Sequence, residues 1–181
     1  MQPRNTLSPA LREIAVNIRY LICDVDGVLT DGTLCLDAHG EECYKTFNVY
    51  DGLGIKLLAS QHITPIVISA KQSAPLQARL IQLGIKHRHL GIADKGACLD
   101  TLIDTHQITS QQIAYVGDDL NDLAPMRRAA LRITVPNAPE YMRQQAHWVT
   151  AAAGGAGAVR EIAEQLLLAQ NTWHLAIEPY L

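Results

Sequence analysis

Short apolar runs alternate along this chain with longer stretches that mix apolar and polar residues. Residues 20–24 and 64–69 (Thr-Pro-Ile-Val-Ile-Ser) are typical of strands buried on both faces. Similar patterns predict strands at 86–90, 113–116, 131–135 and 147–149, and helices at 9–17, 52–60, 74–83, 94–105, 119–128 and 157–169. Because strands alternate with helices, we expect an α/β fold with a central parallel sheet and helices on both faces.

Local signals sharpen two of these helices and add a hairpin. Ser8 is a candidate N-cap for the helix that starts at Pro9, and Gly84 is a candidate C-cap for the helix over 74–83. Two short strands at 33–37 and 42–47 flank Ala38-His39-Gly40, a sequence that favours a turn. The chain therefore predicts a small β-hairpin after its first strand.

Length and composition favour one domain over residues 1–181, since 48% of residues are apolar and 18% are charged. The net charge of −3 offers no basic surface for nucleic acid. No apolar run reaches the roughly 20 residues that span a bilayer, and residues 1–19 lack the apolar core of a signal peptide. The four cysteines have no Cys-x-x-Cys spacing, so we expect reduced thiols and a cytoplasmic protein without a membrane partner.

Polar side chains gather where the predicted strands end, which is where open α/β sheets bind their ligands. Taken singly, each is a residue type that turns, caps and surfaces favour anyway. Their common location at one edge of the sheet carries the signal. They are Asp24 and Asp26 after the first strand, Ser69 and Lys71 after the second, Lys95 at a helix start, and Gly117-Asp118-Asp119-Leu120-Asn121-Asp122 after the strand at 113–116.

This set of side chains supplies what phosphoryl transfer needs. A carboxylate nucleophile can form an acyl-phosphate and so divide hydrolysis into two easier steps. Clustered aspartates suit a hard divalent cation, and lysine and serine donors offset the charge of the transferring group. The sequence has no His-Glu-x-x-His motif and no Gly-x-x-x-x-Gly-Lys-Ser/Thr loop that would compete for the site.

The motifs together resemble those of haloacid-dehalogenase-superfamily phosphatases, over roughly residues 19–169. Within that superfamily the chain is similar to the small, capless 3-deoxy-D-manno-octulosonate 8-phosphate (KDO 8-phosphate) phosphatases of lipopolysaccharide biosynthesis. The similarity rests on Asp-Val-Asp-Gly-Val-Leu-Thr-Asp-Gly at 24–32, Phe-Asn-Val-Tyr-Asp-Gly-Leu-Gly-Ile at 47–55, Tyr-Val-Gly-Asp-Asp-Leu-Asn-Asp at 115–122 and Gly-Gly-Ala-Gly-Ala-Val-Arg-Glu at 154–161. It implies a Rossmann-like fold without a cap domain.

The resemblance also implies a role for each acid. Asp24 would be the nucleophile, and Asp26 would be the general acid toward the leaving oxygen and then the base for water. Mg²⁺ would be held by Asp24, Asp118 and the backbone carbonyl of Asp26, with Asp119 and Asp122 orienting these ligands. Contacts to the phosphoryl group or the sugar are implied for Ser69, Lys95, Asn48, Val49, Tyr50, Asp51, Gly52, Lys56, Lys71 and Arg79.

Four positions, in three motifs, depart from the family pattern. Ala70-Lys71 stands where Gly-Arg is common, Tyr50 stands where arginine is usual, and Ala156 replaces a frequent arginine. Lysine keeps the charge of arginine but loses its bidentate fork, so recognition of the sugar carboxylate can differ. These departures leave the phosphatase chemistry untouched and leave the identity of the sugar open.

Without a cap, another surface has to cover the pocket. The resemblance suggests a homotetramer in which a neighbouring subunit does so, with residues 172–181 as a candidate lid. The apolar hairpin residues suit such an interface, although they could equally pack on their own sheet. They are Leu34, Leu36, Tyr44 and Phe47.

Other functions stay open from the sequence. One is a phosphatase for a nine-carbon keto-deoxy sugar acid phosphate or for another small phosphate ester. A second is an inactive homologue that serves as an assembly or regulatory domain. A response-regulator receiver fits least, because its acceptor aspartate would follow the third strand, and here Asp24 and Asp26 follow the first.

Overall fold

The computed structural model describes residues 6–181, so positions 1–5 of the N-terminal segment discussed above lie outside the described residues. Six parallel strands form the central sheet in the order β5-β4-β1-β6-β7-β8. Their bounds are β1 Tyr20–Cys23, β4 Thr64–Ser69, β5 His87–Leu90, β6 Ile113–Val116, β7 Leu131–Thr134 and β8 Trp148–Val149. The predicted parallel α/β sheet is confirmed.

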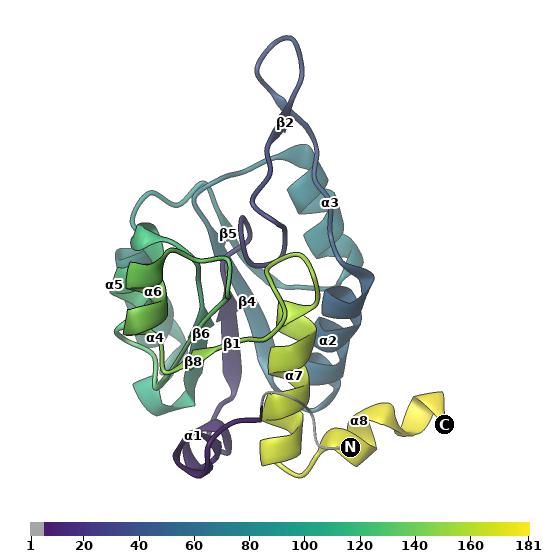
Figure 1. The fold of residues 1–181 in the computed structure, drawn as a ribbon, viewed down its shortest axis with the longest axis vertical. Helices are drawn as coiled ribbons and strands as arrows, with labels where there is room; N and C mark the ends of the chain where they lie inside the picture. Colours follow the sequence, from purple (N-terminus) through teal and green to yellow (C-terminus); the bar gives the residue numbers. More distant parts are fainter. Residues whose placement is uncertain (1–5) are drawn as a thin grey trace.

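Alternation along the strands builds a separate core on each face of the sheet. Leu21 and Cys23 of β1 face α2 (Val49–Ser60) and α7 (Ala158–Ala169), which pack side by side (Figure 1). Ile22 faces the opposite way, into a core shared with α4 (Lys95–His106), α5 (Leu123–Met126) and α6 (Glu140–Gln145). Helices therefore cover both faces, as the sequence pattern predicts.

The strand register brings the chemistry-bearing segments together. Cys23 of β1 pairs with Val67 of β4 on one side and with Val116 of β6 on the other. The residues that follow these three strands must then emerge at the same edge of the sheet. Asp24 and the segment after Val116 are neighbours for this reason.

Several helices start or end where their capping residues dictate. The Ser8 side chain accepts a hydrogen bond from the backbone N–H of Leu11 at the start of α1 (Pro9–Ala15). Asn48 caps α2 in the same way, so this helix begins at residue 49, earlier than predicted. Gly84 adopts a left-handed φ of +73° just after α3 (Ala74–Gln82), which fits the predicted end of that helix.

The prediction of one continuous helix over 119–128 is wrong. The chain instead makes a 3₁₀ turn at Leu120–Asp122 and a short α5 at Leu123–Met126. The turn arises because Asp119 caps it and because the Asp122 carboxylate points back to accept backbone N–H groups. Two short helices, α6 and α8 (Trp173–Ile177), were not predicted from the pattern.

The hairpin is shorter than predicted and projects from the body of the protein. It consists of β2 (Cys35–Leu36) and β3 (Glu42–Tyr44), with a bulge between them, at the top of Figure 1. Leu34, Leu36 and Tyr44 are 44%, 57% and 57% exposed, so they do not pack on their own sheet. Phe47, in contrast, packs against the core of its own subunit. Among residues 6–181, the hairpin and α2 account for all helix and strand between β1 and β4, and no cap domain is present.

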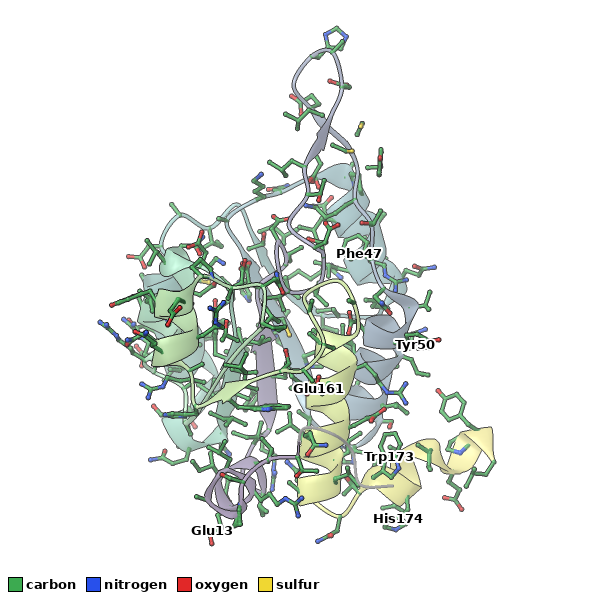
Figure 2. The ribbon with its side chains drawn as sticks, in the orientation of Figure 1. Glu13, Phe47, Tyr50, Glu161, Trp173 and His174 are labelled. Atoms are coloured by element: carbon green, nitrogen blue, oxygen red, sulfur yellow. The ribbon has the colours of Figure 1, made fainter. Side chains whose placement is uncertain are left out.

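The C-terminal segment lies far from the carboxyl ends of the strands. Helix α8 and the 3₁₀ turn at Glu178–Tyr180 run past the far end of α7, with Trp173 against the core and Ala176 2% exposed (Figures 1 and 2). This segment therefore does not cover the site of its own chain. Within the described residues, no helix has the length and apolar character needed to cross a membrane.

Candidate active site

A cleft of about 250 Å³ opens at the carboxyl ends of β1, β4 and β6. Most of the residues predicted for phosphoryl transfer line it. The lining consists of Asp24, Asp26, Gly32, Ser69, Ala70, Lys71, Lys95, Asp118, Asp119 and Asn121. The strand ends thus bring together residues from four separate parts of the chain.

A buried ion cluster forms the floor of the cleft. Lys95, the first residue of α4, places Nζ 2.8 Å from Asp24 Oδ1 and 2.8 Å from Asp122 Oδ1. The three residues are 1%, 6% and 0% exposed, in the order Lys95, Asp24 and Asp122. Charges at this depth persist only when they are paired, so each member depends on the others.

The Asp122 carboxylate is engaged at both oxygens. Oδ1 accepts a hydrogen bond from Tyr115 Oη at 2.7 Å besides that from Lys95, and Oδ2 accepts from the backbone N–H groups of Asp118 and Asp119 at 3.1 and 3.4 Å. Asp122 therefore fixes the backbone that carries Asp118. Gly117 is required here, because a Cβ at that position would lie 2.4 Å from Asp122 Cβ.

Crowding of carboxylates raises the proton affinity of the floor. Burial, followed by the negative charge of Asp122, raises the pKa of Asp24 to about 8 even though Lys95 opposes the shift. Burial and the charges of Asp122 and Asp119 raise the pKa of Asp118 to about 6. Like charges held this close favour either protons or a cation between them.

A hard divalent cation fits this donor set. One carboxylate oxygen from each of Asp24, Asp118 and Asp122 lies within 4.8 Å of the others. Asp118 also packs directly on Gly27, where an added Cβ would come within 1.9 Å of Asp118 Oδ2. Oxygen ligands at this spacing are those that Mg²⁺ and similar ions take.

Asp26 lies at the mouth of the cleft and is held by a residue that sequence reasoning missed. Its side chain is 24% exposed, and its Oδ1 accepts a hydrogen bond from Nζ of Lys45, whose own side chain is 0% exposed. Lys45 also lies 2.6 Å from Glu42 Oε1. No spacing signal could have revealed this pair, because Asp26 and Lys45 are 19 positions apart and meet only through the path of the hairpin.

The other cleft residues are placed by the ends of their elements. Ser69, the last residue of β4, is 1% exposed and its Oγ accepts from the backbone N–H of Lys71 at 3.2 Å. Lys71 itself is exposed at the rim. Asp119 is exposed too, and its carboxylate accepts from the N–H of Leu120 at 2.7 Å.

The predicted sugar-contacting segment 48–52 does not line the cleft of its own chain. Val49 is 73% exposed on α2, and Tyr50, which is labelled in Figure 2, is 64% exposed. Asp51 is 1% exposed, and its carboxylate accepts from the backbone N–H groups of Gly157 and Arg160 at 3.3 and 2.8 Å. In this chain Asp51 thus anchors the start of α7.

The two remaining basic candidates also lie outside the cleft. Lys56 is exposed on α2. Arg79 packs 5.8 Å above the ring of Phe47, and its Nη2 donates to the backbone carbonyl of Asn48 at 3.5 Å. Asn48 in turn donates through Nδ2 to the carbonyl of Gly155 at 3.4 Å. These residues join α2, α3 and the glycine-rich loop.

The glycine-rich loop at 151–157 braces the turn that follows Asp26. Gly154 packs so closely that a Cβ there would meet the carbonyl oxygen of Gly27 at 1.7 Å. Asn137 donates through Nδ2 to the same carbonyl at 3.3 Å, and its Oδ1 accepts from the N–H of Gly154 at 2.9 Å. Glu161 accepts from the backbone N–H of Ala152 at 2.8 Å and so fixes the start of the loop.

Comparisons with known proteins agree with this geometry. Residues 91–162 match the family model of haloacid dehalogenase-like hydrolases. The 3-deoxy-D-manno-octulosonate 8-phosphate phosphatase of Yersinia pestis is 43% identical over 157 residues, which cover 87% of this chain and 83% of that protein.

Solved structures give the same result. The Moraxella catarrhalis 3-deoxy-D-manno-octulosonate 8-phosphate phosphatase, in complex with magnesium ion, phosphate ion and KDO, superposes with a TM-score of 0.91 at 36% identity, covering 97% of this chain and 100% of that one. The cobalt-bound Haemophilus influenzae enzyme superposes with a TM-score of 0.86 at 40% identity, covering 90% and 94%.

The parallel sheet, with carboxylates at the ends of β1 and β6, defines a haloacid dehalogenase-like hydrolase. At the identity and coverage of these relatives, the chain belongs to the 3-deoxy-D-manno-octulosonate 8-phosphate phosphatase family.

Proposed function

We propose that this protein is a Mg²⁺-dependent phosphatase that hydrolyses KDO 8-phosphate to KDO and inorganic phosphate in lipopolysaccharide precursor biosynthesis. One observation carries the proposal: a buried carboxylate, Asp24, is paired with Lys95 on the cleft floor, while a second carboxylate, Asp26, stands at the mouth. This division suits a nucleophile and a proton carrier. The family relatives supply the substrate class.

In the proposed reaction Asp24 attacks phosphorus and forms an aspartyl-phosphate while the bond to the sugar oxygen breaks. The protonated Asp26 gives its proton to that leaving oxygen. In the second step Asp26, now a carboxylate, takes a proton from water as the water attacks phosphorus, and the bond to Asp24 breaks. Proton transfer of this kind contributes about 10²–10⁴-fold to rate.

A cation bound on the floor, together with Lys95, would prepare the site for an anionic group. Asp24, Asp118 and the backbone carbonyl of Asp26 would hold Mg²⁺, which when bound offsets charge on the phosphoryl oxygens. Lys95 keeps Asp24 in place at 2.8 Å and adds a fixed cation, and Ser69 adds a hydroxyl at the end of β4. Asp122 keeps the Asp118 backbone in position, and Asp119 caps the turn that follows it.

Sugar recognition uses the rim and a second subunit. Lys71 is the basic side chain at the rim of the chain's own cleft, where it would face the sugar carboxylate. Asn48, Val49, Tyr50, Asp51, Gly52, Lys56 and Arg79 act from α2 and α3, either toward a neighbouring cleft or by shaping this one. Tyr50 and Ala156 replace family arginines, so the sugar is held with fewer cations than in relatives that have both.

The proposed assembly is a cytoplasmic homotetramer in which residues 1–181 of each copy act as one catalytic domain. Leu34, Leu36 and Tyr44 form an exposed apolar surface on the hairpin, next to the cleft residue Gly32. A second copy that covered this surface would also exclude water from the cleft. Residues 172–181, which lie away from their own cleft, would serve as a lid for a neighbouring subunit.

Magnesium-dependent phosphate release across a panel of esters tests the proposal. The panel contains KDO 8-phosphate, its nine-carbon sugar-acid analogue, simple hexose and pentose phosphates, and an EDTA control. We expect kcat/KM for KDO 8-phosphate to exceed the others by at least about tenfold, a difference of about 1.4 kcal/mol, and to vanish with EDTA. Preference for the nine-carbon ester would reassign the substrate, and no hydrolysis of any ester would favour an inactive assembly domain.

A further inference from the structure

The geometry points to Lys45 as a positioning residue for Asp26, so that the hairpin contributes to catalysis as well as to shape. This inference rests on the proposed function, because it assigns a task to Lys45 within that reaction. It begins from the contact of Lys45 Nζ with Asp26 Oδ1, made by a side chain that is 0% exposed.

Lys45 is itself held in place. Its Nζ lies 2.6 Å from Glu42 Oε1, and the Glu42 side chain is only 10% exposed. A lysine has four rotatable side-chain bonds, and ordering it costs free energy unless its partners repay that cost. Two carboxylates around one shielded ammonium group supply such partners, so the Nζ position is well defined.

Asp26 needs an external support of this kind. It precedes Gly27, whose φ of +87° turns the chain sharply away from the sheet, and its side chain is 24% exposed at the cleft mouth. A carboxylate there would otherwise sample several rotamers. With Oδ1 held by Lys45, Oδ2 is the oxygen free to face the reacting group.

Lys45 keeps the same protonation state throughout the proposed reaction. When the phosphorus–oxygen ester bond breaks, the proton passes from the Asp26 carboxyl group to the leaving oxygen. When water attacks the aspartyl-phosphate, a proton from water returns to Asp26. Lys45 keeps all three of its protons and acts only by fixing where these transfers occur, which matters because small displacements of a reacting group are costly.

The contact between Lys45 and Asp26 depends on the hairpin that directly precedes Lys45. Glu42 opens β3 and Tyr44 closes it, so the pairing of β2 with β3 sets the position of both Lys45 and its partner. The hairpin tip carries no cleft residue, whereas its base carries this contact. Displacement of β3 should therefore reach the chemistry through Asp26.

The inference is tested with two substrates whose leaving groups differ in their need for a proton. An alkyl phosphate such as KDO 8-phosphate needs protonation of its leaving oxygen, whereas p-nitrophenyl phosphate releases a stable phenolate. For Lys45→Met we expect kcat/KM, which reports only the steps through departure of the leaving group, to fall by about 10²-fold on the alkyl ester and by less than about tenfold on the nitrophenyl ester. Asp26→Asn should give the same selective pattern, and Lys86→Met, an exposed lysine at the other end of the sheet, should leave both rates unchanged.

Further variants separate positioning from folding. Lys45→Arg keeps a donor and should recover most of the alkyl-ester rate, and Glu42→Gln should show a smaller loss with the same selectivity. If Lys45→Met does not fold, as judged by circular dichroism, the two substrates are compared with Glu42→Gln instead. Equal losses of kcat/KM on the two substrates, or no loss, would overturn the inference. A wild-type enzyme that hydrolyses only other alkyl esters would refute the proposed substrate instead, and the same ratio would be measured on those esters.

Discussion

The floor of the cleft and its rim are built in opposite ways. On the floor, Lys95, Asp122 and Tyr115 are at most 1% exposed. The Asp122 carboxylate accepts hydrogen bonds from both of the other side chains. On the rim, Leu36 and Tyr44 are each 57% exposed and have no comparable packing. The floor lies at the ends of parallel strands, whereas this part of the rim is a two-stranded hairpin, and Lys71 reaches the rim from the end of β4.

This difference separates two tasks. A preorganised floor stabilises charge without reorganising during the reaction, which requires burial and fixed partners. A rim that selects a sugar and excludes water has to open for entry, so it cannot be buried in the free chain. Changes on the floor should therefore alter chemistry or folding, and changes on the rim should alter affinity or assembly.

The largest effect is expected from removal of the floor nucleophile. Asp24→Asn should abolish turnover, by about 10⁴-fold or more, because the amide does not form the acyl-phosphate. Folding should survive, since Lys95 keeps its contact with Asp122. Phosphate release and circular dichroism measure the two properties, and turnover close to that of the wild type would remove Asp24 from the role of nucleophile.

The next effect concerns stability. Lys95→Met leaves Asp24 and Asp122 without their shared cation, which should lower the free energy of unfolding by about 3–5 kcal/mol. The same substitution at exposed Lys86 should change it by no more than about 0.5 kcal/mol. Urea unfolding of both variants makes the comparison, and equal midpoints would show that the floor is not held by this charge.

A pH series isolates the acids of the floor. Folding raises the pKa of Asp24 to about 8 and that of Asp118 to about 6, from an ordinary 3.8. Each acid therefore binds its proton more tightly in the folded chain, so its contribution to stability is complete below pH 4 and is lost as the pH rises toward 8. In EDTA, the melting temperature should fall across this window, and Asp118→Asn should flatten the lower part of the decline. A profile unchanged by that substitution would contradict the assignment.

Changes to the exposed apolar residues of the hairpin should alter the oligomeric state. Replacing both Leu36 and Tyr44 by serine should dissociate the proposed tetramer while changing the unfolding free energy of one copy by about 0.5 kcal/mol or less. Val16→Ser, at an apolar position that is 46% exposed after α1, is the matched control. Light scattering after size-exclusion chromatography reports the mass, and an unchanged tetramer would place the interface elsewhere.

The smallest effect is expected at the C-terminus. Residues 178–181 end in Tyr180 and Leu181, which are 63% and 97% exposed. Deleting them should leave melting temperature and oligomeric mass unchanged and raise KM by less than about tenfold if the segment covers a neighbouring cleft. Steady-state kinetics on KDO 8-phosphate measure this change, and identical constants would show that residues 178–181 take no part in the proposed lid.

The sequence predicts the floor better than the rim, for a physical reason. Strand ends follow from local apolar patterning, and parallel pairing then brings Asp24, Ser69 and Asp118 to one edge. Lys45 depends on the path of a bulged hairpin, which no local pattern specifies. Asp51 was predicted to contact substrate, and its hydrogen bond to Arg160 spans 109 positions. The break in the 119–128 helix likewise depends on Asp122 turning inward toward Lys95.

The brace between the glycine-rich loop and the catalytic turn has a consequence for biogenesis. The hydrogen bond from Asn137 to the Gly27 carbonyl spans 110 positions, and Gly154 packs closely against the same carbonyl. A nascent chain that has emerged only as far as β7 already carries all the carboxylates of the floor, yet the turn beyond Asp26 has nothing to rest against. Contacts of such long range form only once the entropy cost of closing a large loop has been met. The growing polypeptide should therefore stay inactive on the ribosome at least until the glycine-rich loop at 151–157 has emerged.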